Sequence, residues 1–210
     1  MKSVRVFLVT ALLLFVSGVV TITHAQELKE QWNESAKLIE QEKFSEAVTL
    51  LQNMLANDAL PEQIRPGVLF RLAYSYSGLG NEKKAAETWK MVLELLPEEG
   101  SVWANLGWSQ YLLGDIKEAI VSTEKGLAFD ESMMYAWANL GLYHLDLGNK
   151  DAAMKAYNTA MEKVTGEDDI KGAVDDLEKL ASKKPELKNE IDALRQRFAE
   201  AAKQAGEKTE

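Results

Sequence analysis

The five residues Trp103-Ala-Asn-Leu-Gly107 occur again, unchanged, as Trp137-Ala-Asn-Leu-Gly141. The two copies are 34 residues apart, and other positions keep the same interval. These positions include Leu72, Leu106 and Leu140; Gly80, Gly114 and Gly148; and Ala85, Ala119 and Ala153. A fixed period of this length is typical of proteins built from stacked structural repeats.

Each unit has the pattern of two helices joined by a tight turn. Apolar residues recur at helical spacing on both sides of a Gly-Asn or Gly-Asp pair, which lies at Gly80, Gly114 and Gly148. A glycine just after a helix readily takes the left-handed conformation that ends it. We expect the Asn or Asp that follows to cap the next helix with its side chain. The sequence therefore predicts an all-α chain of helical hairpins.

Small residues mark where the two helices of a unit should touch. Gly107 and Gly141 lie in the middle of the first helix, and Ala119 and Ala153 lie near the start of the second. Because small side chains let two helix backbones approach closely, we expect a tight contact here, with Trp and Tyr residues packed around it.

The order of these residues resembles the tetratricopeptide repeat. The unit that starts at about residue 134 matches its motif at Trp137, Leu140, Gly141, Ala153, Tyr157 and Ala160. The resemblance covers about residues 28–165. It implies a right-handed superhelix of stacked helix–turn–helix repeats with a concave groove that binds a partner.

We expect four such repeats within residues 26–165, at about 28–61, 66–99, 100–133 and 134–167. The first is degenerate, because Ser35 replaces the mid-helix glycine and Glu42 replaces the turn glycine. Four extra residues separate it from the second repeat, and they fall in a predicted loop at residues 57–66. Atypical first repeats are common, since an end repeat has a neighbour on one side only.

Residues 166–203 lack the repeat signature and form two amphipathic stripes. The first stripe is Ile170, Val174, Leu177 and Leu180, and the second is Leu187, Ile191, Leu194, Phe198 and Ala201. We interpret them as a C-terminal pair of capping helices that covers the last repeat, followed by a frayed tail at residues 204–210. The second stripe also has heptad character, so a dimer seam is the alternative.

Residues 1–25 have the layout of a secretory signal peptide. Lys2 and Arg5 precede an apolar core, and the small residues Thr23 and Ala25 stand before a cut at Gln26. The strongly apolar core is about 15 residues long, whereas a membrane-spanning helix needs about 20. We therefore expect an exported protein, periplasmic in a bacterium or otherwise secreted, without a stable membrane span. An uncleaved anchor is the alternative.

Composition argues against several functional classes. The absence of cysteine excludes disulfides, zinc–thiolate sites and a cysteine nucleophile. Of the two histidines, His24 lies in the segment that we expect to be removed, and His144 alone cannot build a multi-histidine metal site. The 33 acidic residues against 24 basic ones disfavour nucleic-acid binding. No phosphate-binding glycine loop or Gly-x-Ser-x-Gly motif is present. We expect no cofactor, no metal and no enzymatic activity.

The resemblance places certain repeat positions on the concave groove. The candidate peptide-binding residues among them are Phe70, Arg71, Tyr74, Asn105, Trp108, Tyr111, Tyr135 and Asn139. The lysines with which chaperone-binding relatives hold a carboxylate are missing. The fifth position of each repeat, where such a lysine would stand, is occupied by Trp32, Phe70, Ala104 and Ala138. Asn105 and Asn139 match asparagines that hold a peptide backbone in some relatives. The alternative is that they bond only within the scaffold.

The function that follows is a non-catalytic scaffold or adaptor that binds a peptide segment of a protein partner in the groove. Aromatic residues and arginine are the types that anchor protein interfaces, and we expect Arg71 to favour an acidic group on the partner. The alternative is a self-associating structural subunit of an envelope or secretion assembly, whose groove is filled by its own helix. A homo-oligomer is compatible with both.

Removal of the signal peptide predicts Gln26 as the first residue of the exported protein. N-terminal sequencing of the periplasmic or secreted fraction checks this, and Ala25→Arg is the control, because a bulky charged residue before the cut blocks cleavage. A soluble intracellular protein that keeps Met1 would contradict the prediction.

Overall fold

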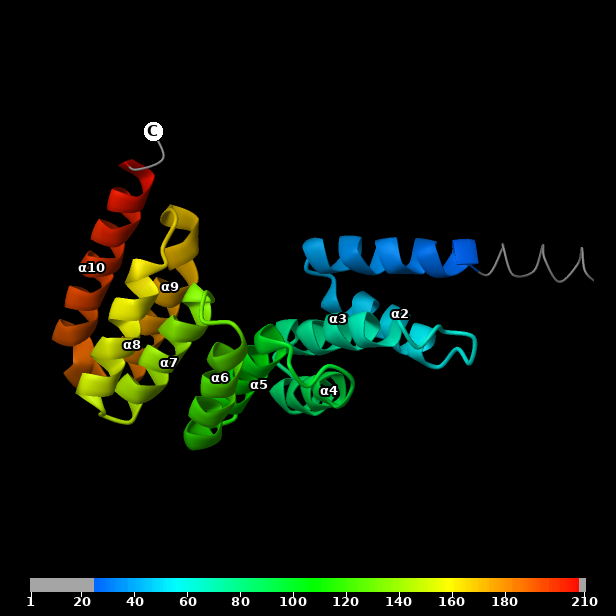
Figure 1. Ribbon diagram of the computed structural model, residues 1–210, viewed down its shortest axis with the longest axis horizontal. Helices are drawn as coiled ribbons and strands as arrows, with labels where there is room; N and C mark the ends of the chain where they lie inside the picture. Colours follow the sequence, from blue (N-terminus) through cyan, green and yellow to red (C-terminus); the bar gives the residue numbers. More distant parts are fainter. Residues whose placement is uncertain (1–24, 208–210) are drawn as a thin grey trace, which may run out of the picture. The chain divides into compact units, whose positions relative to one another are not determined.

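The structure of the protein is a computed structural model that describes residues 25–207 (Figure 1). Apart from Ala25, the predicted signal peptide lies outside the described residues. Within the described range the chain forms helices and turns, with no strand. It divides into two compact units, one ending at Asn81 and the other beginning at Glu82. The boundary falls in the turn of the predicted second repeat.

The N-terminal unit contains three described helices. The first occupies residues 25–40 and is followed by α2 (Phe44–Leu55) and α3 (Arg65–Gly78). The buried face of α2 is formed by Ala47, Leu51 and Met54. Helix α3 packs against α2, and the two are also joined by Gln52 Nε2, which donates to the Tyr76 hydroxyl over 2.8 Å.

The C-terminal unit is a series of helical pairs. Its helices are α4 (Glu82–Leu95), α5 (Gly100–Leu112), α6 (Ile116–Phe129), α7 (Met134–Asp146), α8 (Lys150–Glu162), α9 (Glu167–Lys183) and α10 (Lys188–Glu207), with a short 3₁₀ helix at Pro185–Leu187. Helix α5 packs against α6, α7 against α8, and α9 against α10 (Figure 1). Between these pairs, α4 contacts α5, α6 contacts α7, and α9 also contacts α7, so that each pair packs on the next. The all-α repeat fold predicted from the sequence is thereby confirmed.

Each hairpin turn is closed by backbone hydrogen bonds. Gly114 has a φ of 91° and donates its N–H to the Tyr111 carbonyl over 2.9 Å, and the Asp115 N–H reaches the Gln110 carbonyl over 2.9 Å. This pair of bonds is the usual glycine-ended helix terminus. The prediction that Asp115 and Asn149 cap the next helix with their side chains is wrong, because neither side chain makes a capping bond. Their backbones turn away from the extended cap conformation, with ψ at 58° and 67°.

Each of the two repeated tryptophans, Trp103 and Trp137, donates a hydrogen bond to the loop that precedes its helix. Trp103 Nε1 donates to the Pro97 carbonyl over 2.8 Å, and Trp137 Nε1 donates to the Glu131 carbonyl over 2.9 Å. The acceptor is a backbone carbonyl in both cases. Loss of the motif proline at Glu131 therefore leaves this bond intact.

The last two helices cover the final repeat. Leu187, Ile191, Leu194 and Phe198 are buried within the chain, and the Phe198 ring meets Tyr157 of α8 edge-on at 5.8 Å. These apolar side chains pack against the chain's own helices, so they are not exposed for dimerisation with a second copy. Ala202, not Ala201, is the buried alanine at its end. Helix α10 continues to Glu207, so the first residues of the predicted frayed tail are helical.

The degenerate turn at Glu42 keeps the geometry of the glycine turns. Its φ is 56°, and the N–H groups of Glu42 and Lys43 reach the carbonyls of Ile39 and Leu38, as they do in the turn at Gly80. A residue with a Cβ is strained there by about 1 kcal/mol relative to glycine.

Glu42→Gly should therefore stabilise the protein by up to about 0.5 kcal/mol, because the greater freedom of glycine in the unfolded chain offsets part of the relieved strain. Urea denaturation followed by circular dichroism measures the change. Glu46→Gly is the matched control, because it lies inside α2, where glycine destabilises by about 1 kcal/mol. Destabilisation by both changes would show that the turn is not held in the left-handed conformation.

Candidate protein-binding face

Two asparagines occupy equivalent positions on neighbouring repeats of the C-terminal unit. Asn105 lies on α5 and Asn139 on α7, and both are half-buried. Neither amide makes a hydrogen bond to another described residue. Half-buried amides without partners inside the chain are free to bond a ligand. We call the surface formed by Asn105, Trp108, Tyr135 and Asn139 the α5–α7 face.

The alanines beside the asparagines belong to the core. Ala104 and Ala138 are buried, with Ala104 packed near Leu127 and Leu140. The fifth repeat position, assigned to the groove by the resemblance, is therefore not part of the open surface in these two repeats. A partner would contact the asparagines and their aromatic neighbours instead.

Tyr111 connects two repeats. Its ring stacks on Tyr143 with the centroids 4.6 Å apart, and its hydroxyl donates to Asp146 Oδ2 over 3.0 Å. The other carboxylate oxygen, Asp146 Oδ1, lies 2.7 Å from Lys184 Nζ, just after α9. The polar atom of Tyr111 is thus already bonded within the chain, and its main role is to join α5 to α7.

Helix α9 narrows one end of this surface. Trp108 and Tyr111, with Leu142 beneath them and Asp176 and Lys179 of α9 opposite, line a crevice of about 40 Å³. That volume is small compared with the roughly 300–1,000 Å³ of ligand-binding pockets, so the crevice is a minor part of the surface. The open part of the α5–α7 face lies around the asparagines and Tyr135, whose side chain is 42% exposed.

In the N-terminal unit the predicted site residues lie on α3. Tyr74 is 49% exposed and meets the Phe44 ring edge-on at 6.3 Å, while Phe70 is half-buried. Arg71 places its guanidinium 3.2 Å from the Trp32 ring centroid and donates to the Trp32 carbonyl and, over 2.7 Å, to Ser35 Oγ. We expected Arg71 to face an acidic partner group; instead it joins the first two predicted repeats.

Comparison with known protein families supports the helical-repeat fold. The tetratricopeptide repeat family matches at residues 68–98 and again at residues 135–162. The chain contains tetratricopeptide repeats. No curated protein sequence matches it.

Solved structures with a similar fold include several of MamA. One crystal structure of MamA has a TM-score of 0.60 and 19% identity, and the match covers 82% of this chain and 96% of that one. A double mutant, MamA RS-1, has a TM-score of 0.60 and 18% identity over 84% of this chain and 94% of its own. At this identity the likeness shows the fold alone. Tetratricopeptide-repeat folds are protein-interaction scaffolds, and they typically act without catalysis.

The described part of the chain contains no cluster of three histidine or acidic side chains suited to a metal ion. None of its helices combines the length and the apolar character needed to cross a membrane. His144 lies on α7 next to α6 and α8, where its imidazole helps to line a surface hollow with Trp137 and Leu140.

The Tyr111–Asp146 bond predicts a pH-dependent loss of stability. Burial, and then the nearby charge of Asp146, raise the pKa of Tyr111 above its ordinary value near 10. A tyrosine held neutral in the folded state contributes stability that is complete below pH 10 and is lost as the pH rises further. Burial also raises the pKa of Tyr143 and Tyr157, so they contribute in the same direction.

Tyr111→Phe should lower the free energy of unfolding at pH 7 by about 1–2 kcal/mol and make its decline above pH 10 shallower. Urea denaturation from pH 7 to pH 11 measures both effects. Tyr74→Phe is the control, because it removes an exposed hydroxyl and should change stability by less than about 0.5 kcal/mol. Equal effects of the two changes would rule out the interhelical role of Tyr111.

Proposed function

We propose that the protein is an exported, non-catalytic adaptor that binds an extended segment of a partner protein on the α5–α7 face. The observation that carries the proposal is the pair of unbonded amides of Asn105 and Asn139. An extended peptide presents unpaired N–H and C=O groups, and an asparagine amide can accept from one and donate to the other. Equivalent positions on successive repeats provide two such contacts along one segment.

Side-chain contacts on this face are largely apolar. Tyr135 is exposed, and the half-buried ring of Trp108 lies on the same helix as Asn105. Aromatic rings provide large contact areas at low conformational cost. We therefore infer a mostly apolar partner segment with limited sequence selectivity.

Export is supported by the sequence rather than by the described residues. The layout of Lys2, Arg5, the apolar core and Ala25 is that of a signal peptide. A chain without cysteine also suits an oxidising compartment, because it has no thiol to form unwanted disulfides.

Self-association remains the second candidate, and one observation bears on it. Helix α9 packs beside α7 and narrows the crevice next to Trp108, so the chain's own helix covers one end of the face. The same helix leaves Asn105 and Asn139 half-exposed. We therefore favour a separate partner segment as the occupant of the asparagine region.

The test is the double variant Asn105→Ala/Asn139→Ala. Peptides selected from a random display library on the mature parent protein should bind the variant more weakly by about 1–3 kcal/mol, because the peptide groups lose partners in a partly desolvated site. Calorimetric titration measures the affinity, and circular dichroism confirms that the helices are retained.

Asn189→Ala is the matched control, because Asn189 is an exposed asparagine at the start of α10. It should leave peptide affinity unchanged. Unchanged affinity in the double variant would exclude the α5–α7 face as the binding surface. Sedimentation of the parent protein addresses self-association: a dimer that the selected peptides dissociate would favour the second candidate.

A further inference from the structure

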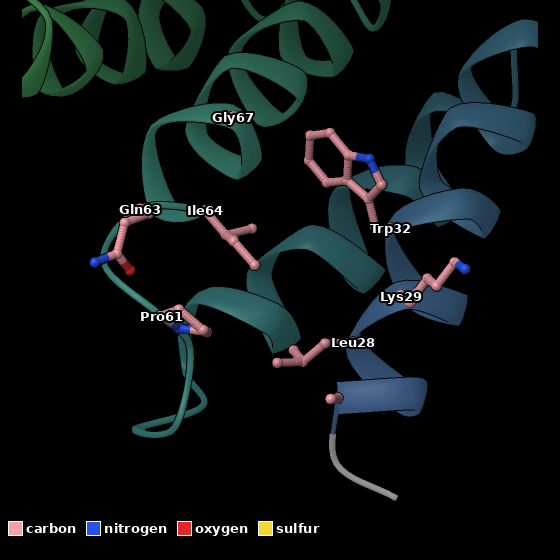
Figure 2. A pocket seen from close by; sticks show the side chains of 8 residues that line it. Leu28, Lys29, Trp32, Pro61, Gln63, Ile64 and Gly67 are labelled. Carbon is pink, nitrogen blue, oxygen red and sulfur yellow. The ribbon is translucent and has the colours of Figure 1, made fainter. Parts of the chain in front are cut away.

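A cavity of about 500 Å³ opens within the N-terminal unit. It lies between the helix at residues 25–40, the loop after α2 and the start of α3 (Figure 2). Leu28 and Trp32 form one wall, Pro61 and Ile64 form the other, and Gly67 lies beside the tryptophan. Cavities of this size are typical of ligand-binding pockets.

The cavity stays open because Trp32 is held in place. The Arg71 guanidinium covers one part of its ring system at 3.2 Å, and Arg71 is fixed in turn by its bond to Ser35. A Cβ at Gly67 would lie only 3.0 Å from Trp32 Cη2, so the indole edge already fills the space above the glycine. A ring held on these sides cannot swing into the cavity and close it.

The second wall comes from the four residues inserted between the first two predicted repeats. Leu60 is buried and anchors the loop, and the Ile64 N–H donates to the Pro61 carbonyl over 3.0 Å, which makes a tight turn. Pro61 further restricts the loop backbone. The insertion thus forms a rigid edge that presents Ile64, 37% exposed, opposite Leu28.

The chemistry of the cavity specifies its occupant. Figure 2 shows Ile64 and Leu28 turned toward the same space, while the amide of Gln63 and the ammonium of Lys29 point away from it. The interior therefore suits an uncharged, apolar group. Lys29 lines the rim with its alkyl stem, and its ammonium makes no ion pair within the described residues. An anion next to the entering group would complement this charge.

We propose that this cavity is a docking site for one apolar side chain of a partner protein, on a segment that carries a carboxylate beside that side chain. The volume accommodates an aromatic ring or a leucine, and the preformed walls reduce the entropy lost on binding. This site does not depend on Asn105 or Asn139, and it stands whether or not the α5–α7 face binds a peptide.

The probes are four fluorescein-labelled peptides with blocked ends and one flexible polar frame. Their central residues are Phe-Leu-Asp, Phe-Leu-Asn, Phe-Leu-Lys and Ser-Ser-Asp. Fluorescence anisotropy with the full mature chain should show that the Phe-Leu-Asp peptide binds about five-fold more tightly than the other two Phe-Leu peptides, which is the usual upper range for an exposed ion pair. The Ser-Ser-Asp peptide should bind at least about ten-fold more weakly, since it buries no apolar side chain.

Two variants locate the binding to the cavity. Ile64→Ser should weaken the Phe-Leu-Asp peptide about five-fold, because it removes apolar contact from one wall. Lys29→Glu should reverse the charge preference, so that the Phe-Leu-Lys peptide binds best; a purely structural role for Lys29 would not do this. Lys37→Glu, on the same helix and paired with Glu34 at 3.7 Å, is the matched control and should preserve the order of affinities.

Asn105→Ala/Asn139→Ala should leave these affinities unchanged, which separates this site from the proposed function. Peptide binding that is unaffected by both Ile64→Ser and Lys29→Glu would overturn the proposal. Tighter binding of dodecanoate than of any peptide would also overturn it, in favour of a site for a free amphiphile. A dimer that Ile64→Ser dissociates would overturn it in favour of a second copy of the chain.

Discussion

The close approach of two helix backbones at a glycine is the constraint on which the repeat unit depends. A Cβ at Gly107 would lie 2.3 Å from Thr123 Oγ1 and 2.9 Å from the Ala119 carbonyl, so α5 and α6 can pack at this distance only without a side chain. At Gly141 the space is filled by the Tyr157 ring, 2.8 Å from where a Cβ would stand. Tyr157 in turn meets Phe198. The absence of a side chain at Gly141 of α7 therefore makes room for Tyr157 of α8, which in turn contacts Phe198 of the capping helix α10.

Backbone geometry, rather than side-chain identity, preserves the fold where the motif fails. Glu42 takes the same left-handed conformation as the turn glycines. The Glu131 carbonyl accepts a hydrogen bond from Trp137, as the Pro97 carbonyl does from Trp103 in the preceding repeat. In both cases the interaction that matters is made by main-chain atoms. Departures from the repeat consensus can thus be tolerated at a modest energetic cost wherever the consensus residue serves only to favour a backbone conformation.

The predicted site residues divide according to whether their polar groups are already bonded. Arg71 and Tyr111 hold neighbouring helices together, whereas the amides of Asn105 and Asn139 have no partner among the described residues. Residue type and repeat position placed all four on the same predicted groove. They could not distinguish these roles, because the difference depends on Ser35, Trp32 and Asp146, which lie 35 to 39 residues away along the chain.

The repeat period, the helical hairpins, the turn positions and the repeat family could all be predicted from the order of residues. These features follow from the spacing of apolar, small and glycine residues, which acts over a few turns of helix. Three features could be seen only in the folded protein. The second C-terminal stripe is buried within the chain, α9 narrows the crevice beside Trp108, and the inserted loop borders an apolar cavity against Trp32. Each of these depends on which side chains from separate helices meet, and on whether a neighbour leaves room between them. No pattern within a single helix contains that information.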